Sequence, residues 1–130
     1  MKSGLQAFIS GFIGPALIFI LFIALFMPAG SSFFIRVYPA YLLPIVWGLW
    51  NVLYYYFGRH AVILKKLGVW GAVLGLVTSL SGIFFFNTLA FYKQYITASV
   101  TLENVILIEI IIYFILWEVV IRYLNKVLID

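Results

Sequence analysis

The chain has no cysteine and very little charge. Its 130 residues include one histidine, eight Lys and Arg residues and four Asp and Glu residues. Disulfides, thiolate metal sites, iron–sulfur clusters and cysteine nucleophiles within the chain are therefore excluded. The single histidine, His60, excludes haem ligation by two histidines of this chain, and zinc would lack its usual set of ligands. We predict no metal site and no cofactor.

Residue groupings that carry enzyme chemistry are missing as well. No serine has a base nearby in the sequence, no glycine-rich phosphate loop follows a strand, and the apolar segments contain no Asp. We therefore predict no catalytic residue and a protein that is not an enzyme. The net charge of +4 would suggest nucleic acid in a soluble protein, but here the basic residues are spread over loops and ends. Such a distribution is typical of membrane topology, so we expect no nucleic-acid partner.

Apolar residues are what the chain has in excess. They make up 66% of the sequence, and 9% charged residues are too few to cover the surface of a soluble domain of this length. Four apolar stretches each approach the roughly 20 residues that a helix needs to cross a bilayer. These stretches are apolar throughout, without the alternation of a membrane β-barrel strand. They predict transmembrane helices over residues 7–28, 40–58, 69–92 and 102–124.

The fold class that follows is an all-α integral membrane protein with a single transmembrane domain. Short connections favour antiparallel neighbours, so we predict a compact antiparallel bundle of four transmembrane helices. A basic cluster between the second and third segments, which indicates a cytoplasmic loop, consists of Arg59, Lys65 and Lys66. With both termini cytoplasmic, six basic residues lie inside, and Arg36 and Lys93 lie outside. We expect a multi-pass protein of the cell inner membrane or an equivalent membrane, surrounded by lipid.

Small residues recur at helical spacing in two of the segments. In the third segment they form a stripe that includes a G-x-x-x-G pattern, and its members are Gly71, Gly75, Ser79 and Gly82. The first segment carries Gly11 and Gly14. Such spacing lets two helix backbones approach closely, so it predicts a helix-packing interface. The partner stays open: another helix of this chain, a second copy, or a different protein.

The candidate functional residue is Glu109, a carboxylate inside a run of isoleucine and leucine in the fourth segment. No Lys or Arg is expected at its depth unless Arg36 of the first loop dips inward, so the neutral form of Glu109 is favoured. Intramembrane ionisable residues are functional hypotheses by default. Two interpretations stay open. Protonated Glu109 either hydrogen-bonds across a helix interface and fixes its register, or it gains and loses a proton, or ligates a cation, during transport.

Candidate partners for Glu109 are Asn51, Asn87 and Tyr113. Asn51 is the only amide in the middle of the second segment, where it forms an interhelical hydrogen bond or contacts a ligand. Asn87 is expected slightly shallower than Glu109 and Asn51 slightly deeper, whereas Tyr113 shares a helix face with Glu109. A polar site built from Glu109, Asn51, Asn87 and a Ser or Tyr hydroxyl is therefore geometrically possible.

The other carboxylates of the fourth segment have ordinary explanations. Thr101 is a suitable N-cap, and Glu103 suits the positive end of the helix dipole that follows it. Glu118 precedes Arg122 by one helical turn, which predicts an ion pair. Glu109 alone is left without a charged partner.

Three functions are compatible with the sequence. The first is a non-enzymatic accessory, assembly or oligomeric subunit that acts through helix packing, as a homo-oligomer or in a larger membrane complex. The second is a small oligomeric proton-coupled transporter or channel that uses Glu109. The third is a lipid- or quinone-handling membrane protein that uses the aromatic face of the second segment.

Overall fold

All regular structure in the described part of the chain is helical. The computed structural model describes residues 2–26, 38–61 and 65–130, and no strand occurs in these ranges. The elements in chain order are α1 (Lys2–Phe26), η2 (Tyr38–Leu42), α3 (Leu43–Tyr56), η3 (Gly58–His60), α4 (Leu67–Phe86), α5 (Thr88–Tyr95), α6 (Leu102–Leu116), η4 (Trp117–Ile121) and α7 (Arg122–Leu128). The prediction of an all-helical chain is confirmed.

Three helical stretches are long and apolar enough to cross a bilayer. They are Ser3–Leu25, Leu67–Phe86 and Leu102–Leu128, which correspond to α1, α4 and the continuous helix formed by α6, η4 and α7. Helices of this length and composition indicate a membrane protein. The predicted end of the first segment, at residue 28, lies outside the described residues.

The second predicted segment, residues 40–58, does not form a single α-helix long enough to cross a bilayer. Its α-helical part, α3, has 14 residues. Pro44 lies in the first two positions of α3, where its missing N–H is tolerated, and the residues before it form the 3₁₀ helix η2 instead. The prediction of four membrane-length α-helices is therefore not confirmed.

The prediction that residues 69–92 form one continuous helix is wrong. α4 ends at Phe86, and Asn87 adopts the left-handed conformation with φ 52° and ψ 41°. Asn tolerates this conformation better than most residues do, because its short polar side chain can hydrogen-bond locally. The chain then folds back into α5. A Cβ atom on Gly82 would lie 3.0 Å from Thr88 Oγ1, so the start of α5 packs against the last turn of α4.

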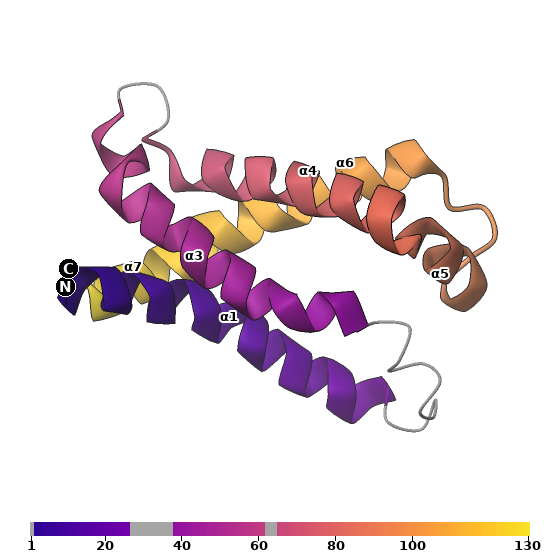
Figure 1. Cartoon of the computed structure of the whole chain (residues 1–130), viewed down its shortest axis with the longest axis horizontal. Helices are drawn as coiled ribbons and strands as arrows, with labels where there is room; N and C mark the ends of the chain where they lie inside the picture. Colours follow the sequence, from indigo (N-terminus) through magenta and orange to yellow (C-terminus); the bar gives the residue numbers. More distant parts are fainter. Residues whose placement is uncertain (1, 27–37, 62–64) are drawn as a thin grey trace.

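The helices form two antiparallel pairs (Figure 1). α1 packs along α3, and α4 packs along α6. Glycines bring the helices of each pair close together. A Cβ atom on Gly11 would lie 2.6 Å from the Trp47 carbonyl oxygen, and one on Gly71 would lie 2.5 Å from the Tyr113 carbonyl oxygen. A larger residue at either position would push the two backbones apart.

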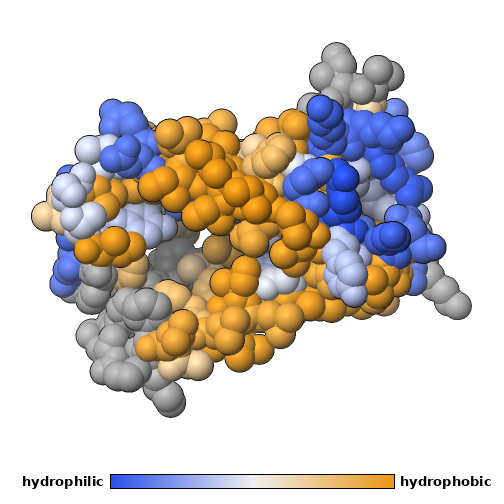
Figure 2. Space-filling view, turned by 180° about the vertical axis from the view of Figure 1, so that it is seen from behind, coloured by the Kyte–Doolittle hydropathy of each residue, from blue (hydrophilic) through white to orange (hydrophobic). Residues whose placement is uncertain are grey.

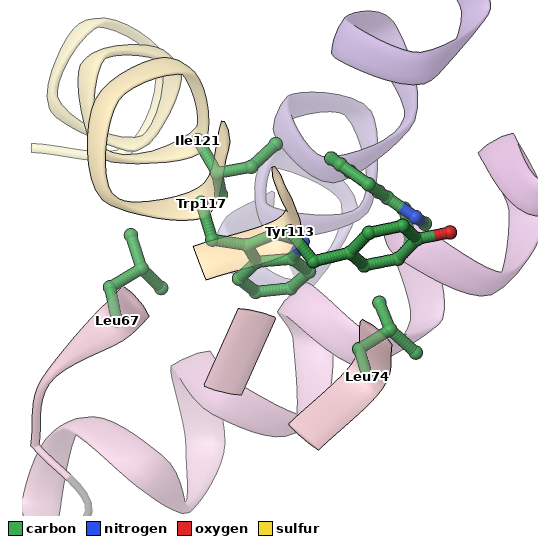
Figure 3. Packing of buried hydrophobic residues seen from close by; sticks show 6 residues of the cluster. Leu67, Leu74, Tyr113, Trp117 and Ile121 are labelled. Carbon is green, nitrogen blue, oxygen red and sulfur yellow. The ribbon is translucent and has the colours of Figure 1, made fainter. Parts of the chain in front are cut away.

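The two pairs meet at one end of the molecule and diverge at the other. The two ends of the chain lie at the closed end, together with the last turn of α3 and the first turn of α4, and α5 lies at the opposite end (Figure 1). At the closed end α1 contacts η4 and α7. A buried apolar cluster joins the pairs, and it consists of Trp47, Leu67, Leu74, Tyr113, Trp117 and Ile121. Figure 3 shows five of these side chains converging from α4 and from the helix that runs from α6 into α7.

The surface is polar at both ends and apolar between them (Figure 2). Large apolar side chains are exposed along every long helix, for example Leu21 on α1, Leu49 on α3 and Ile115 on α6, at 63%, 56% and 52% exposure. A water-soluble protein rarely exposes so continuous an apolar surface. A bilayer satisfies it, in agreement with the three membrane-length helices.

Candidate functional site: the cleft between the helix pairs

Glu109 has a hydrogen-bond partner that differs from those expected. The Tyr92 hydroxyl donates to Glu109 Oε1 over 3.1 Å. Tyr92 lies on α5, and it reaches α6 because the chain reverses at Asn87. A continuous helix through residue 92 would carry Tyr92 beyond α4 and away from this contact. The left-handed conformation of Asn87 therefore brings Tyr92 within hydrogen-bond distance of Glu109.

Two adjoining cavities fill the space between the diverging helix pairs, and we call them together the cleft. The first, of about 340 Å³, is lined from α1, η2, α3, α5, α6 and the last residue of α4, and the second, of about 440 Å³, is lined from η2, α3, α4, α5 and α6. Both are bordered by Leu43, Tyr92 and Tyr113. Figure 2 shows a hollow in the apolar face of the molecule, between the two helix pairs.

A third cavity, of about 500 Å³, lies between α5, the segment that follows it and the first turns of α6, and we call it the α5–α6 cavity. Glu109 borders both this cavity and the second cavity of the cleft, and Tyr92 borders all three. The Tyr92–Glu109 pair therefore stands at the boundary between the cleft and the α5–α6 cavity. It is the position at which a molecule in either space would meet a carboxylate.

The walls of the cleft are mostly apolar and aromatic. Trp47 and Tyr113 pack with ring centroids 4.9 Å apart, and both border the first cavity. The second cavity adds the hydroxyl of Thr78, which is bonded to the Leu74 carbonyl oxygen over 2.9 Å. An apolar cavity with a few convergent polar groups is typical of a small-molecule site. Tyr113 thus lies beside Glu109 in the same cleft, as its helix face predicts.

Asn51 does not reach Glu109. It is fully buried near the closed end and donates to the Ala7 carbonyl oxygen, to Ser10 Oγ and to Asn125 Oδ1, each over 2.7 Å. Asn125 Nδ2 donates back to Asn51 Oδ1 over 3.1 Å, and the Ser10 hydroxyl also bonds Asn125 Oδ1. We call Ser10, Asn51 and Asn125 the amide cluster. It ties α1, α3 and α7 together.

Asn87 does not reach Glu109 either. It is exposed, and its role is the chain reversal between α4 and α5. A polar site made of Glu109, Asn51 and Asn87 is therefore absent from the described structure. Counting residues along the helices predicts similar depths for these three residues. It does not determine which way each side chain points.

Glu118 has two partners, and sequence reasoning found one of them. Its Oε1 forms the predicted ion pair with Arg122. Its Oε2 accepts a hydrogen bond from the Gly68 backbone N–H over 2.9 Å. That N–H belongs to the first turn of α4, where backbone donors lack partners within the helix. Glu118 therefore caps α4 from the neighbouring helix and has a structural role.

The small residues predicted to form a packing interface meet partners in this chain. Cβ atoms on Gly71 and Gly75 would lie within 3 Å of α6 or η4, and one on Gly14 would lie 3.3 Å from Val120. Gly82 packs against Thr88, and Ser79 is buried with its hydroxyl bonded to the Leu76 carbonyl oxygen over 3.1 Å. The glycine contacts hold this chain's own helices together.

The basic cluster lies around the connection between α3 and α4. The Arg59 guanidinium stacks over the Tyr55 ring, 3.9 Å from its centroid, and its Nε donates to His60. Lys65 and Lys66 are exposed. None of the three borders the cleft, so the cluster is separate from the site of Glu109.

Comparison with protein-family models, with curated proteins and with solved structures finds no match to this chain.

Proposed function

We propose that this protein is a four-span membrane protein that binds a lipid-soluble amphiphile in the cleft between its two helix pairs. The observation that carries the proposal is a largely apolar cleft, bordered by aromatic rings and by one carboxylate, in the middle of an apolar surface. A molecule dissolved in the bilayer would meet similar surroundings inside the cleft, while its polar group would gain hydrogen bonds or a charge partner. The proposal narrows the predicted lipid- or quinone-handling function to the binding of an amphiphile in the cleft.

The four-span arrangement is part of the proposal. η2 and α3 follow each other without a break, and together they extend about 30 Å, the thickness of a hydrocarbon core. Their antiparallel course beside α1 supports a second crossing (Figure 1). The termini and the basic connection between α3 and α4 lie at one end, which supports a cytoplasmic position for that end.

The accessory-subunit function has less support, because its main argument was the stripe of small residues. Gly71 and Gly75 are covered by this chain's own η4 and α6, so they leave no glycine groove for a partner helix. Oligomerisation through other surfaces stays a prediction. The transporter function also uses Glu109, and it would require the cleft to open alternately to each side of the membrane.

A matched pair of substitutions tests binding in the cleft. Ile112 borders all three cavities and Ile111 borders none of them, yet their exposure is nearly the same, 47% and 48%. Ile112→Trp would fill part of the cleft, and Ile111→Trp would add the same ring on the lipid-facing side. Each variant is purified in a non-ionic detergent and washed extensively, and the retained lipid-soluble molecules are identified by mass spectrometry.

The wild type and Ile111→Trp are expected to retain a common amphiphile at about one molecule per chain, as one cleft implies. Ile112→Trp is expected to lose it. Retention of the same molecule by both variants, or no retained molecule in the wild type, would contradict binding in the cleft.

A further inference from the structure

We infer that the cleft selects an amphiphile with a positively charged ammonium head group, which Glu109 binds at the boundary with the α5–α6 cavity. This inference rests on the proposed binding of an amphiphile and adds the chemical class of its head group. Three properties of the described residues support it: the unused hydrogen-bonding capacity of Glu109, the positions of the basic residues, and the aromatic lining.

The first property concerns the Glu109 carboxylate. An ionised carboxylate offers about four lone-pair sites. One site on Oε1 is taken by the Tyr92 hydroxyl, which is a neutral donor. The side chain borders the second cavity of the cleft and the α5–α6 cavity, so a ligand in either space can approach the remaining sites. A single neutral hydrogen bond offsets little of the cost of a negative charge in apolar surroundings.

The second property is the position of the basic residues. Arg122 pairs with Glu118, Arg59 stacks on Tyr55, and Lys93 is exposed on α5. Within residues 2–26, 38–61 and 65–130, no Lys or Arg forms an ion pair with Glu109. A bound cation would supply the charge that complements an ionised Glu109.

The third property is the aromatic lining. Tyr92 and Tyr113 border the cleft beside Glu109, and Trp47 and Phe91 border its first cavity. The faces of aromatic rings attract ammonium groups, and they do so more strongly when water is excluded. An anionic head group would instead meet Glu109 with the same sign of charge. A neutral quinone carbonyl has no hydrogen to donate to the remaining lone pairs of an ionised Glu109.

An amphiphile series with one tail and different head groups tests the inference. The protein is held in uncharged dodecyl maltoside micelles, and radiolabelled dodecyltrimethylammonium is titrated into it, with protein-free micelles as background. Unlabelled dodecanol, dodecyl sulfate and lysophosphatidylethanolamine then compete for the site. Lysophosphatidylethanolamine distinguishes the ammonium of a lipid head group from a free ammonium amphiphile, because its ammonium is accompanied by a phosphate.

Dodecyltrimethylammonium is expected to bind in excess over empty micelles, with dodecanol and dodecyl sulfate as weak competitors. Glu109→Gln is expected to weaken its binding roughly tenfold to a hundredfold, the range for loss of an interaction that involves charged groups. Glu103→Gln is the control, because it changes the net charge equally at an exposed position of α6. Glu109→Asp keeps the charge and should keep the preference for the cation over dodecanol.

Two results would overturn the inference. One is equal binding of dodecyltrimethylammonium to the wild type and to a folded Glu109→Gln variant, and the other is competition by dodecanol as strong as that by the cation. If dodecanol competes equally and Ile112→Trp abolishes binding of both, amphiphile binding in the cleft stands and the preference for a cation fails. If Ile112→Trp and Ile111→Trp bind both molecules as the wild type does, the proposed function fails as well.

Discussion

Among the polar side chains of the described helices, the amide cluster and the Tyr92–Glu109 pair are built in opposite ways. In the amide cluster, Asn51 and Asn125 exchange hydrogen bonds, and Asn51 Nδ2 also lies within hydrogen-bond distance of Ser10 Oγ and of the Ala7 carbonyl oxygen. Ser10 and Asn51 are fully buried. In the second group, Tyr92 makes one hydrogen bond to Glu109, and cavities adjoin both residues.

The difference separates a structural role from a binding role. Polar groups that satisfy one another in a closed space stabilise the packing of helices, and a ligand could reach them only by breaking that packing. A carboxylate with one partner among the described residues and open space on two sides can accept further donors without rearrangement. The closed end of the molecule therefore holds the helix pairs together, and the open end is where a ligand can bind.

The largest effect should come from disturbing the closed end at Gly71. A Cβ atom there would lie 2.5 Å from Trp117 Cβ and from the Tyr113 carbonyl oxygen. Since backbone atoms cannot give way easily, Gly71→Ala is expected to lower the free energy of unfolding by about 2–3 kcal/mol. Gly14→Ala, whose Cβ atom would meet side-chain atoms only, the nearest being Val120 Cγ1 at 3.3 Å, is the control and should cost less. Unfolding by SDS in mixed micelles measures both, and equal losses would contradict the packing described here.

A smaller effect is expected from the amide cluster. Asn51→Ala and Asn125→Ala each break the reciprocal amide hydrogen bonds, so the two changes should be coupled. We expect a coupling free energy of about 1 kcal/mol in a double-mutant cycle, within the range for hydrogen bonds between membrane helices. Additive losses of stability would show that the two amides do not stabilise the fold together.

The smallest effect on stability is expected at the open end. Tyr92→Phe removes the hydrogen bond to Glu109 and leaves the ring in place, so the free energy of unfolding should change by about 0.5 kcal/mol or less. The same SDS titration measures it. If Tyr92→Phe destabilises the protein as much as Asn51→Ala does, the Tyr92–Glu109 pair is a structural contact, and the contrast between the two groups disappears.

Local sequence signals predicted much of the fold. The runs of apolar residues located the helices, Thr101 is the N-cap of α6 as predicted, and Glu118 pairs with Arg122 one turn away. Each of these features depends on residues close together in the chain. The number of membrane-length α-helices was harder to predict, because Pro44 and the 3₁₀ helix before it shorten α3.

The candidate site could be predicted only in part. Glu109 was found because a carboxylate is rare in such a segment, but its partner Tyr92 depends on the left-handed conformation of Asn87, for which a single Asn is a weak signal. Asn125 was missed as the partner of Asn51 because it follows the predicted end of the last segment. In both cases the contact depends on the direction of a side chain around its helix, which depth along the helix does not determine.

The π-helical turn η4 sets the direction of the Asn125 side chain relative to that of Tyr113. The Arg122 backbone N–H bonds the Trp117 carbonyl oxygen, five residues back, so this turn takes in one residue more than an α-helical turn. In a regular α-helix, Tyr113 and Asn125 would point about a third of a turn apart. The wider turn sets back the residues after it by roughly 100°, so that both side chains point toward α3, Tyr113 to Trp47 and Asn125 to Asn51. The wider turn thus accommodates one extra residue near Val119, and a one-residue deletion there would give a regular α-helix in which the two side chains, then eleven residues apart, still point within about 20° of each other.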